Sequence, residues 1–160
     1  MSETPASWVP ALGRIPSGLS IITARHGDAT TGMLASWVQQ CSFEPPMVSF
    51  AIRQGRPVGE WLQVGAAFTI NLLADDQKKL IGHFGKGFAL DQPAFEGLNI
   101  RTEGNSAPIL NDSLAYLLCR VTGRVLTGDH ELILGSVHGG ALQMADAKPM
   151  VHVRKSGLHY

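Results

Sequence analysis

The stretch LAYLLCRVTGRVLTGDHELILGSV, residues 114–137, decides the fold because it holds two strand-like runs joined by a tight turn. Within residues 116–125 the side chains alternate between two faces, which is typical of a half-buried antiparallel strand. The dipeptide Gly128-Asp129 lies between apolar residues on both sides, and a Gly-Asp pair in that place favours a two-residue hairpin. The stretch therefore predicts a β-hairpin with His130 at its rim.

Further runs rich in β-branched and aromatic residues predict strands at 19–25, 31–39, 47–53, 66–73 and 150–154. Two short helices are expected, one at 58–64 and one at 76–84 with Asp75 as its N-cap. Strands dominate, and no regular alternation of strand and helix is present. The sequence therefore predicts a mainly β protein, a closed or partly closed antiparallel barrel, rather than a parallel sheet.

Length and composition limit the chain to one ordinary domain. Its 160 residues are 44% apolar and 16% charged, which is enough to bury a core. Residues 1–12 are expected to form a flexible N-terminal arm, and residues 13–160 the domain. Thirteen basic residues balance thirteen acidic ones, so neither nucleic acid nor a membrane is an expected partner. Without a spanning segment or a signal peptide, a cytoplasmic location is expected.

Several familiar catalytic and metal-binding motifs are missing. Residues 82–87, GHFGKG, match neither a dinucleotide-binding nor a phosphate-loop pattern. His130-Glu131 begins a zinc motif, but Leu134 stands where the second histidine is needed, and the six histidines are dispersed. No metal site is therefore predicted. Cys41 and Cys119 lack metal or dithiol spacing and are interpreted as two small core thiols.

The block from 32 to 57 has the composition expected at a site for a flat aromatic ligand with an anionic tail. Small residues such as Ala35 and Ser36 let backbone groups approach the polar edge of a ring. Arg53 and Arg56 are candidate donors to a phosphate. The same residues also fit plain strand packing with two solvated arginines, so the local chemistry leaves both interpretations open.

Five segments in order carry a resemblance to a known family: GRIPSGLSIITA (13–24), GMLASWVQQCSFEPP (32–46), FTINLL (68–73), GDH (128–130) and VHVRKSGLHY (151–160). Over 13–160 the chain resembles the flavin reductase-like family of FMN-binding split barrels, which have a Greek-key topology. It is particularly similar to the reductase module at the C-terminus of cyanobacterial flavodiiron proteins. Because the match begins near Met1, the chain is expected to be that module standing alone.

The resemblance implies positions for a cofactor and a co-substrate. The family places the isoalloxazine ring against residues that correspond to Leu34, Ala35, Ser36, Trp37, Cys41 and Ser42. It places the phosphate near Ala51, Arg53 and Arg56, and Phe84 is expected to flank the pocket. His130 matches the residue that lies over the flavin near the nicotinamide, and it is the candidate catalytic residue. FMN is the implied cofactor, with NADH or NADPH as co-substrate.

The function that follows is an NAD(P)H:flavin oxidoreductase, expected as a homodimer, which transfers hydride from a nicotinamide nucleotide to flavin. The electrons would then pass to a partner protein or a free acceptor. The alternative is an FMN electron-transfer module that serves a partner protein without nicotinamide turnover. A third possibility is a barrel with an altered pocket that takes another planar ligand or none.

Overall fold

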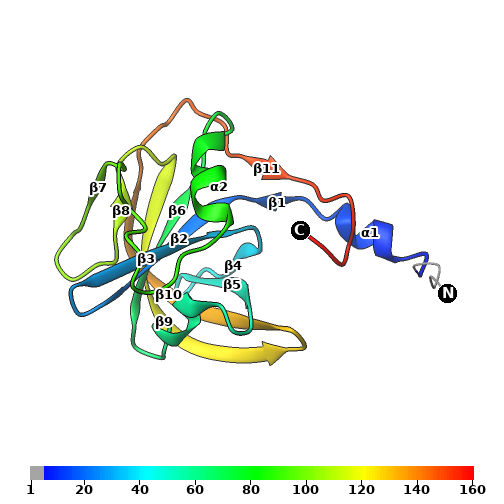
Figure 1. Cartoon of the computed structure of the whole chain (residues 1–160), viewed down its shortest axis with the longest axis horizontal. Coiled ribbons are helices and arrows are strands. Elements are labelled where there is room, and N and C mark those ends of the chain that lie inside the picture. Colours follow the sequence, from blue (N-terminus) through cyan, green and yellow to red (C-terminus); the bar gives the residue numbers. More distant parts are fainter. Residues whose placement is uncertain (1–5) are drawn as a thin grey trace.

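The computed structural model describes residues 6–160, and its main feature is a seven-stranded antiparallel sheet that curls into a barrel (Figure 1). The strands lie in the order β3-β2-β6-β9-β10-β5-β4. Their bounds are β2 (Ser20–His26), β3 (Ala29–Ala35), β4 (Val38–Ser42), β5 (Met47–Arg53), β6 (Ala67–Leu72), β9 (Ala115–Thr127) and β10 (His130–Leu142). The predicted fold class, a mainly β antiparallel barrel with few helices, is confirmed.

The predicted hairpin is present and joins β9 to β10. His130 pairs with Thr127, and Gly128 adopts φ 81°, a conformation that a side chain would disfavour. Strand β10 extends to Leu142, beyond the predicted end at 137. It pairs along its first half with β5 as well, with His130 opposite Arg53. The turn of the hairpin therefore lies beside the end of β5.

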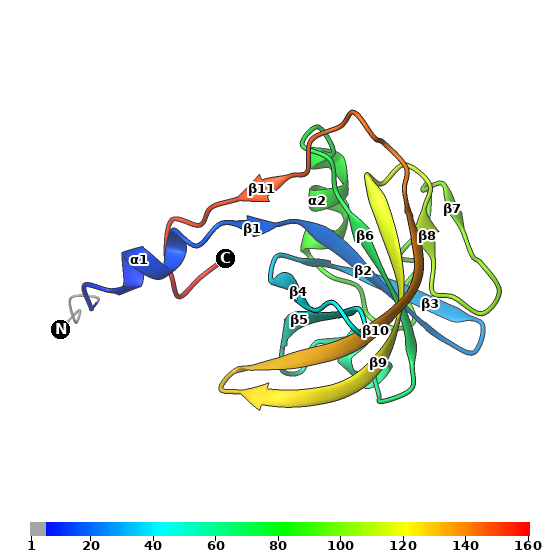
Figure 2. The same ribbon diagram turned by 180° about the vertical axis from the view of Figure 1, so that it is seen from behind.

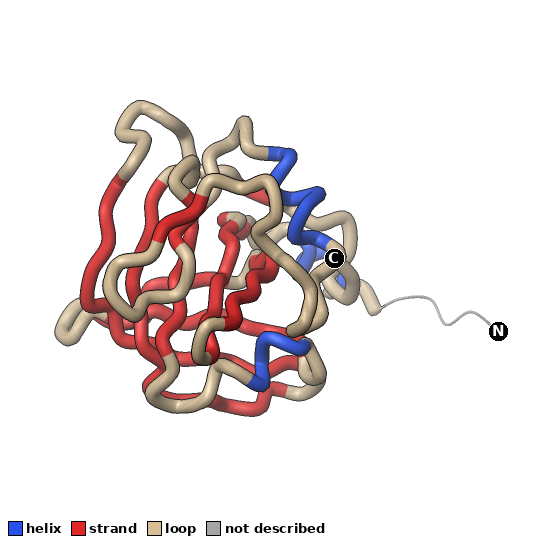
Figure 3. The backbone as a smooth tube through the Cα atoms, turned by 60° about the vertical axis from the view of Figure 1, so that its left-hand side comes forward, coloured by secondary structure: helices blue, strands red, loops and turns tan. Residues whose placement is uncertain are grey.

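A bend at Ser36 and Trp37 lets the sheet curl. The sequence predicted one strand over 31–39, but the structure divides this segment into β3 and β4. Strand β3 pairs with β2, whereas β4 pairs with β5 at the opposite edge of the sheet. The Ala51 N–H donates to the Trp37 carbonyl at 3.1 Å, which holds the bend against β5. The two edges thereby approach each other around an interior (Figure 3).

Short elements complete the chain: α1 (Val9–Gly13), β1 (Ser17–Gly18), η1 (Pro57–Glu60), α2 (Lys78–Gly85), β7 (Ile100–Arg101), β8 (Ile109–Leu110) and β11 (Val151–His152). The helix predicted over 58–64 is only the single 3-10 turn η1. The second helix begins at Lys78 with Gln77 as its N-cap. Asp75 does not cap it, because it lies two residues before the N-cap and no side chain among residues 6–160 forms a capping hydrogen bond there. The Asp75 N–H instead donates to the Lys148 carbonyl.

The segment before the barrel is partly helical. Residues 1–5 of the predicted arm lie outside the described residues, but α1 occupies Val9–Gly13. Arg154 holds α1 from the C-terminal side, since its backbone N–H donates to the Gly13 carbonyl at 3.1 Å and Nη2 donates to the Leu12 carbonyl at 3.3 Å. Helix α1, β1 and β11 project together from the barrel (Figures 1 and 2).

Two apolar clusters support the sheet from its two faces. The cluster inside the barrel centres on fully buried side chains: Ile22, Phe50, Ile52, Phe68, Ile70 and Ile133. The other cluster packs α2 and the following loop against the sheet, and it includes Leu19, Ile21, Leu73, Phe84 and Leu110. Helix α2 is therefore fixed over one end of the barrel by apolar burial.

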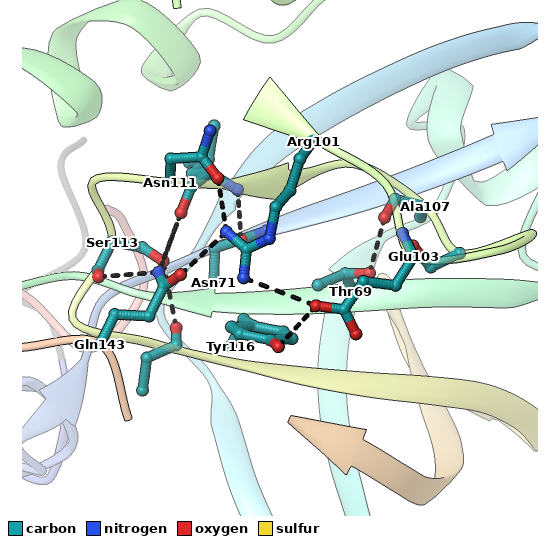
Figure 4. A network of polar contacts seen from close by, with 12 residues as sticks. Thr69, Asn71, Arg101, Glu103, Ala107, Asn111, Ser113, Tyr116 and Gln143 are labelled. Carbon is teal, nitrogen blue, oxygen red and sulfur yellow. Dashed lines mark hydrogen bonds and ion pairs between the residues drawn. The ribbon is translucent and has the colours of Figure 1, made fainter. Parts of the chain in front are cut away.

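A polar network fixes the loop between β7 and β8 onto the sheet (Figure 4). Buried Thr69 donates to the Ala107 carbonyl at 3.0 Å, and the Tyr116 hydroxyl donates to Glu103 at 2.7 Å. Arg101 lies over the Tyr116 ring and donates to Asn111. Because these groups have partners, the network makes this part of the barrel rigid without leaving a buried polar group unpaired.

We expect Gly135→Ala to destabilise the protein by about 1–3 kcal/mol, the usual cost of overpacking. A Cβ on Gly135 in β10 would lie 2.5 Å from the Phe68 ring, which is itself fully buried. Gly123→Ala in β9 is the matched control, because its Cβ would meet Leu134 at an ordinary 3.6 Å. Urea unfolding of both variants measures the difference. An equal stability for the two would contradict this packing.

Candidate functional site

A cavity of about 230 Å³ lies where the ends of β3 and β5 meet α2 and the C-terminal segment. Six residues predicted from the sequence line it: Leu34, Ala35, Ser36, Ala51, Arg53 and Arg56. The structure adds others that the sequence prediction did not place there, including Met33, Ile81 and His152, and Tyr160 lines the cavity as well. Part of the predicted block from 32 to 57 therefore lines one cavity, although these residues come from different strands.

One side of the cavity is apolar and shallow, as a planar ring requires. Ala35 ends β3, Ser36 begins the bend, and Ala51 lies on β5 near the opposite edge of the sheet. Their side chains are too short to fill the space between the strands, while Met33 and Ile81 add apolar surface. A flat aromatic group fits such a wall, with backbone and hydroxyl groups near its edge.

The other side of the cavity carries positive charge. Arg53 ends β5 and Arg56 precedes η1, and neither forms an ion pair with another residue in the described part of the chain. Gly87 adopts φ 75°, and a Cβ there would lie 3.1 Å from Arg56 Nη1, so the glycine leaves room for the guanidinium. Two guanidinium groups without a carboxylate partner suit a phosphate, which accepts several charge-assisted hydrogen bonds. The donor set fits an FMN-like ligand.

His130 is buried, with 8% of its surface exposed, although a hairpin turn residue is usually solvated. Its Nδ1 lies 2.7 Å from Asp129 Oδ1, and its Nε2 lies 2.7 Å from the Tyr160 hydroxyl. The Trp37 ring lies beside it at a centroid distance of 4.8 Å. The C-terminal residues cover the turn, and this long-range contact explains the burial. His130 thus adjoins the cavity through Tyr160.

The pair formed by Asp129 and His130 fixes the orientation of the imidazole. The hydrogen bond from His130 lowers the pKa of the Asp129 carboxyl, and nearby Arg53 adds to this effect. The Asp129 carboxylate accepts a hydrogen bond from the Nδ1–H of His130, so that Nε2 of the ring in this tautomer can accept one from the Tyr160 hydroxyl. The carboxylate therefore fixes the ring with Nε2 directed at the hydroxyl of Tyr160, which lines the cavity, although His130 itself does not line it.

Tyr160 closes the cavity from the C-terminal side. Its ring lies 5.5 Å from Trp37 and its hydroxyl contacts His130, although 66% of the residue is exposed. Enclosure of the hydroxyl end raises the pKa of Tyr160, against the opposing effect of Arg56, Arg154 and Arg53. Three guanidinium groups and the Asp129 carboxylate therefore lie near the Tyr160 phenol.

An ion pair between Arg124 and Glu131 stabilises the hairpin next to His130. Arg124 Nε donates to Glu131 Oε1 at 2.7 Å, and Arg124 Nη1 donates to the Gly59 carbonyl at 3.0 Å. This hydrogen bonding lowers the pKa of the Glu131 carboxyl, so the pair persists at neutral pH. It connects β9 and β10 to η1, which follows Arg56.

The structure does not bring Cys41, Ser42 or Phe84 to the cavity. Cys41 is exposed on the edge strand β4, which corrects the interpretation of it as a core thiol, and Ser42 ends the same strand. Phe84 is 1% exposed and packs against Phe88 and Phe95 beneath α2. Trp37 does not line the cavity itself but contacts both Tyr160 and His130.

Comparisons with known proteins place this chain in a family. The model of the flavin reductase like domain matches residues 12–157. The chain therefore belongs to the flavin reductase like family, as its resemblance predicted. The predicted enzyme class, a flavin reductase among the oxidoreductases, is confirmed at the level of this family.

Individual relatives agree with this assignment. Diflavin flavoprotein A 1 of Synechocystis sp. is 40% identical over 151 residues, which cover 94% of this chain and 26% of the relative. The NADH:FAD oxidoreductase SgcE6 of Streptomyces globisporus shares the fold with a TM-score of 0.82 and 23% identity, covering 90% of this chain and 85% of that one. Nitrilotriacetate monooxygenase component B of Mycobacterium thermoresistibile is 26% identical with a TM-score of 0.79, covering 91% and 80%. The chain thus spans about a quarter of the length of the diflavin relative.

Two further features concern membranes and metals. Within residues 6–160, neither α-helix has the length or the apolar character needed to cross a bilayer. The same residues contain no cluster of three or more His, Cys, Asp or Glu side chains placed to hold a metal ion.

We expect a thiol reagent to modify one cysteine per folded chain at neutral pH. Cys41 is exposed, whereas Cys119 is buried and burial raises its pKa to about 12, so its reactive thiolate is scarce. Labelling followed by mass spectrometry of peptides identifies the modified residue, and unfolding in guanidinium should release the second thiol. Rapid labelling of Cys119 in the folded protein would contradict the structure.

Proposed function

We propose that this chain binds FMN in the cavity and catalyses its reduction by NADH or NADPH. The observation that carries the proposal is the adjacency of a shallow, largely apolar wall and two arginines that lack carboxylate partners. A flavin mononucleotide has the matching parts, a flat tricyclic ring and a terminal phosphate. When bound, the flavin would supply the electron-accepting chemistry of the reaction.

The residues of the cavity would bind and orient this cofactor. Leu34 and Ala51 would pack against the ring, and the Ala35–Ser36 segment would offer polar groups to its edge. Arg53 and Arg56 would hold the phosphate by charge-assisted hydrogen bonds. Positive charge on this side of the site would also stabilise the negative charge that develops during reduction.

His130 would act as the catalytic residue by contacting the nicotinamide. Asp129 keeps a proton on Nδ1, so Nε2 is available to accept a hydrogen bond from an amide N–H. This contact would position the nicotinamide against the cofactor, and correct placement of two reactants accounts for much of the rate in such a transfer. His130 is not required to donate a proton in this role.

The proposed assembly is a homodimer in the cytoplasm. Exposed apolar side chains lie in α1, β1 and β11 or within a few residues of them: Trp8, Ile15, Val151, Val153 and Leu158. An exposed apolar group of this kind is typical of a surface that a second chain covers. A second copy would bury these residues beside the C-terminal end of the cavity.

An electron-transfer module without nicotinamide turnover is the second candidate. It is favoured by the similarity to a diflavin flavoprotein of which this chain covers only 26%. In that case electrons from bound FMN would pass to a partner protein or another module. Anaerobic mixing of FMN-loaded protein with NADH or NADPH distinguishes the two. Rapid loss of the flavin absorption supports the reductase, a persistent yellow colour supports the module, and failure to bind FMN contradicts both.

We expect Arg53→Ala and Arg56→Ala each to weaken FMN binding by about 10- to 100-fold, given the strength of a hydrogen bond to a charged group. Riboflavin has the same ring without the phosphate, so its affinity should change little in both variants. Fluorescence titrations with the two flavins measure the difference. Equal losses for FMN and riboflavin would place the arginines against the ring instead.

We expect His130→Ala to slow flavin reduction by NADH or NADPH by about 10- to 100-fold, because misplaced reactants lose rate on that order. FMN affinity should stay within about threefold. Stopped-flow reduction and FMN titration measure the two effects separately. Loss of FMN binding in this variant would reassign His130 to holding the cofactor.

A further inference from the structure

Tyr160 occupies a place in the site that a substrate would need. It lines the cavity, lies beside Trp37 and contacts Nε2 of His130, which is the nitrogen assigned above to the nicotinamide. With Tyr160 in this position the cavity measures about 230 Å³, below the roughly 300–1,000 Å³ usual for ligand pockets. One planar ring fits such a space more readily than a stack of two.

The segment that carries Tyr160 is held at Arg154 and Gly157, and beyond Gly157 it is held mainly by the side chain of Tyr160. Arg154 is 8% exposed, lies 5.1 Å from the Trp37 ring centroid and donates from Nη1 to the Gly157 carbonyl at 3.5 Å. Gly157 packs so closely against α1 that a Cβ there would overlap Val9 and Leu12. Leu158 and His159 beyond it are exposed. Residues 158–160 can therefore move by rotation about the backbone at Gly157.

We propose that Tyr160 covers the nicotinamide position in the nucleotide-free protein and that NAD(P)H displaces it, an inference that rests on the proposed function. In this displacement, His130 Nε2 exchanges its hydrogen-bond partner, the Tyr160 hydroxyl, for a group of the nucleotide. The Tyr160 hydroxyl lies 2.7 Å from His130 Nε2 in the structure, and the carboxamide N–H of a nicotinamide takes this place on the nitrogen when the nucleotide binds. Tyr160 thus lowers the affinity for the nucleotide by competing with it for the same position. It also covers a bound flavin until the nucleotide binds.

The chain contains two tyrosines, which makes the displacement directly measurable. We would incorporate 3-fluorotyrosine and record ¹⁹F NMR spectra of the FMN-loaded protein while adding NAD⁺ or NADP⁺. Tyr116 is 6% exposed and bonded to Glu103, so its resonance serves as an internal reference. The Tyr160→Phe variant assigns the second resonance. We expect this resonance to move toward the position of free fluorotyrosine on nucleotide addition, while the Tyr116 resonance stays fixed.

Kinetics provide an independent readout. Tyr160→Phe removes the hydroxyl but keeps the ring, and Tyr160→Ala removes both. We expect the half-saturating NAD(P)H concentration for flavin reduction to fall about three- to tenfold in Tyr160→Phe, since a neutral hydrogen bond contributes modestly, and further in Tyr160→Ala. His159→Ala is the matched control on the same exposed segment and should leave this concentration unchanged.

The outcomes separate this inference from the proposed function. If nucleotide reduces the flavin but the Tyr160 resonance stays in place, or if both Tyr160 variants raise the half-saturating concentration, the displacement is wrong while the reductase stands. If FMN binds but neither nucleotide reduces it nor shifts any resonance, both proposals fail. A drop in FMN affinity in Tyr160→Ala, with an unchanged nucleotide requirement, would instead make Tyr160 part of the flavin site.

Discussion

The pairing of β10 with two neighbours is the constraint on which the site depends. One side of β10 forms the hairpin with β9, and the other side pairs with β5 from His130 opposite Arg53 to Ser136 opposite Met47. A shift of this register by one residue would turn each of these side chains to the opposite face of the sheet. The same ladder therefore places the candidate catalytic residue and a candidate phosphate-binding residue side by side.

The bend at Ser36 and Trp37 supplies the other half of the site. It allows the chain to leave β3 at one edge of the sheet and to join β5 at the other, so that Ala35 and Ala51 face a common cavity. Trp37 then lies between the barrel and the projecting segment, in contact with His130, Tyr160 and Arg154. The C-terminal segment is thus connected to the bend beside the cavity through one aromatic ring.

The sequence predicted those parts of the fold and site that depend on local patterns. The hairpin at Gly128 could be predicted because its turn residues and flanking strands are adjacent in the chain. The local composition of residues 32–57 left both a ligand site and plain strand packing open, and the family resemblance singled out the residues of which six line the cavity. The burial of His130 could not, because it depends on a contact with Tyr160, thirty residues away. Phe84 and Cys41 likewise needed the packing of α2 and the edge position of β4 to be known.

The site combines a rigid part, the barrel, with a mobile part, the residues after Gly157. The barrel beneath it is fixed by apolar burial and by paired polar groups, whereas the residues after Gly157 have few contacts besides those of Tyr160. A rigid wall for a ring and a movable aromatic cover would together let one cavity hold a cofactor and admit a second ring only when needed. In this arrangement, function depends on a rigid barrel wall together with a mobile Tyr160.

A crystal structure of the protein grown with FMN tests the central claim most directly. The account predicts density for the tricyclic ring against Ala35, Ser36 and Ala51, with the phosphate within hydrogen-bonding distance of Arg53 and Arg56. Density for the cofactor at another place, or a cavity filled by the protein's own side chains while FMN remains in solution, would contradict it.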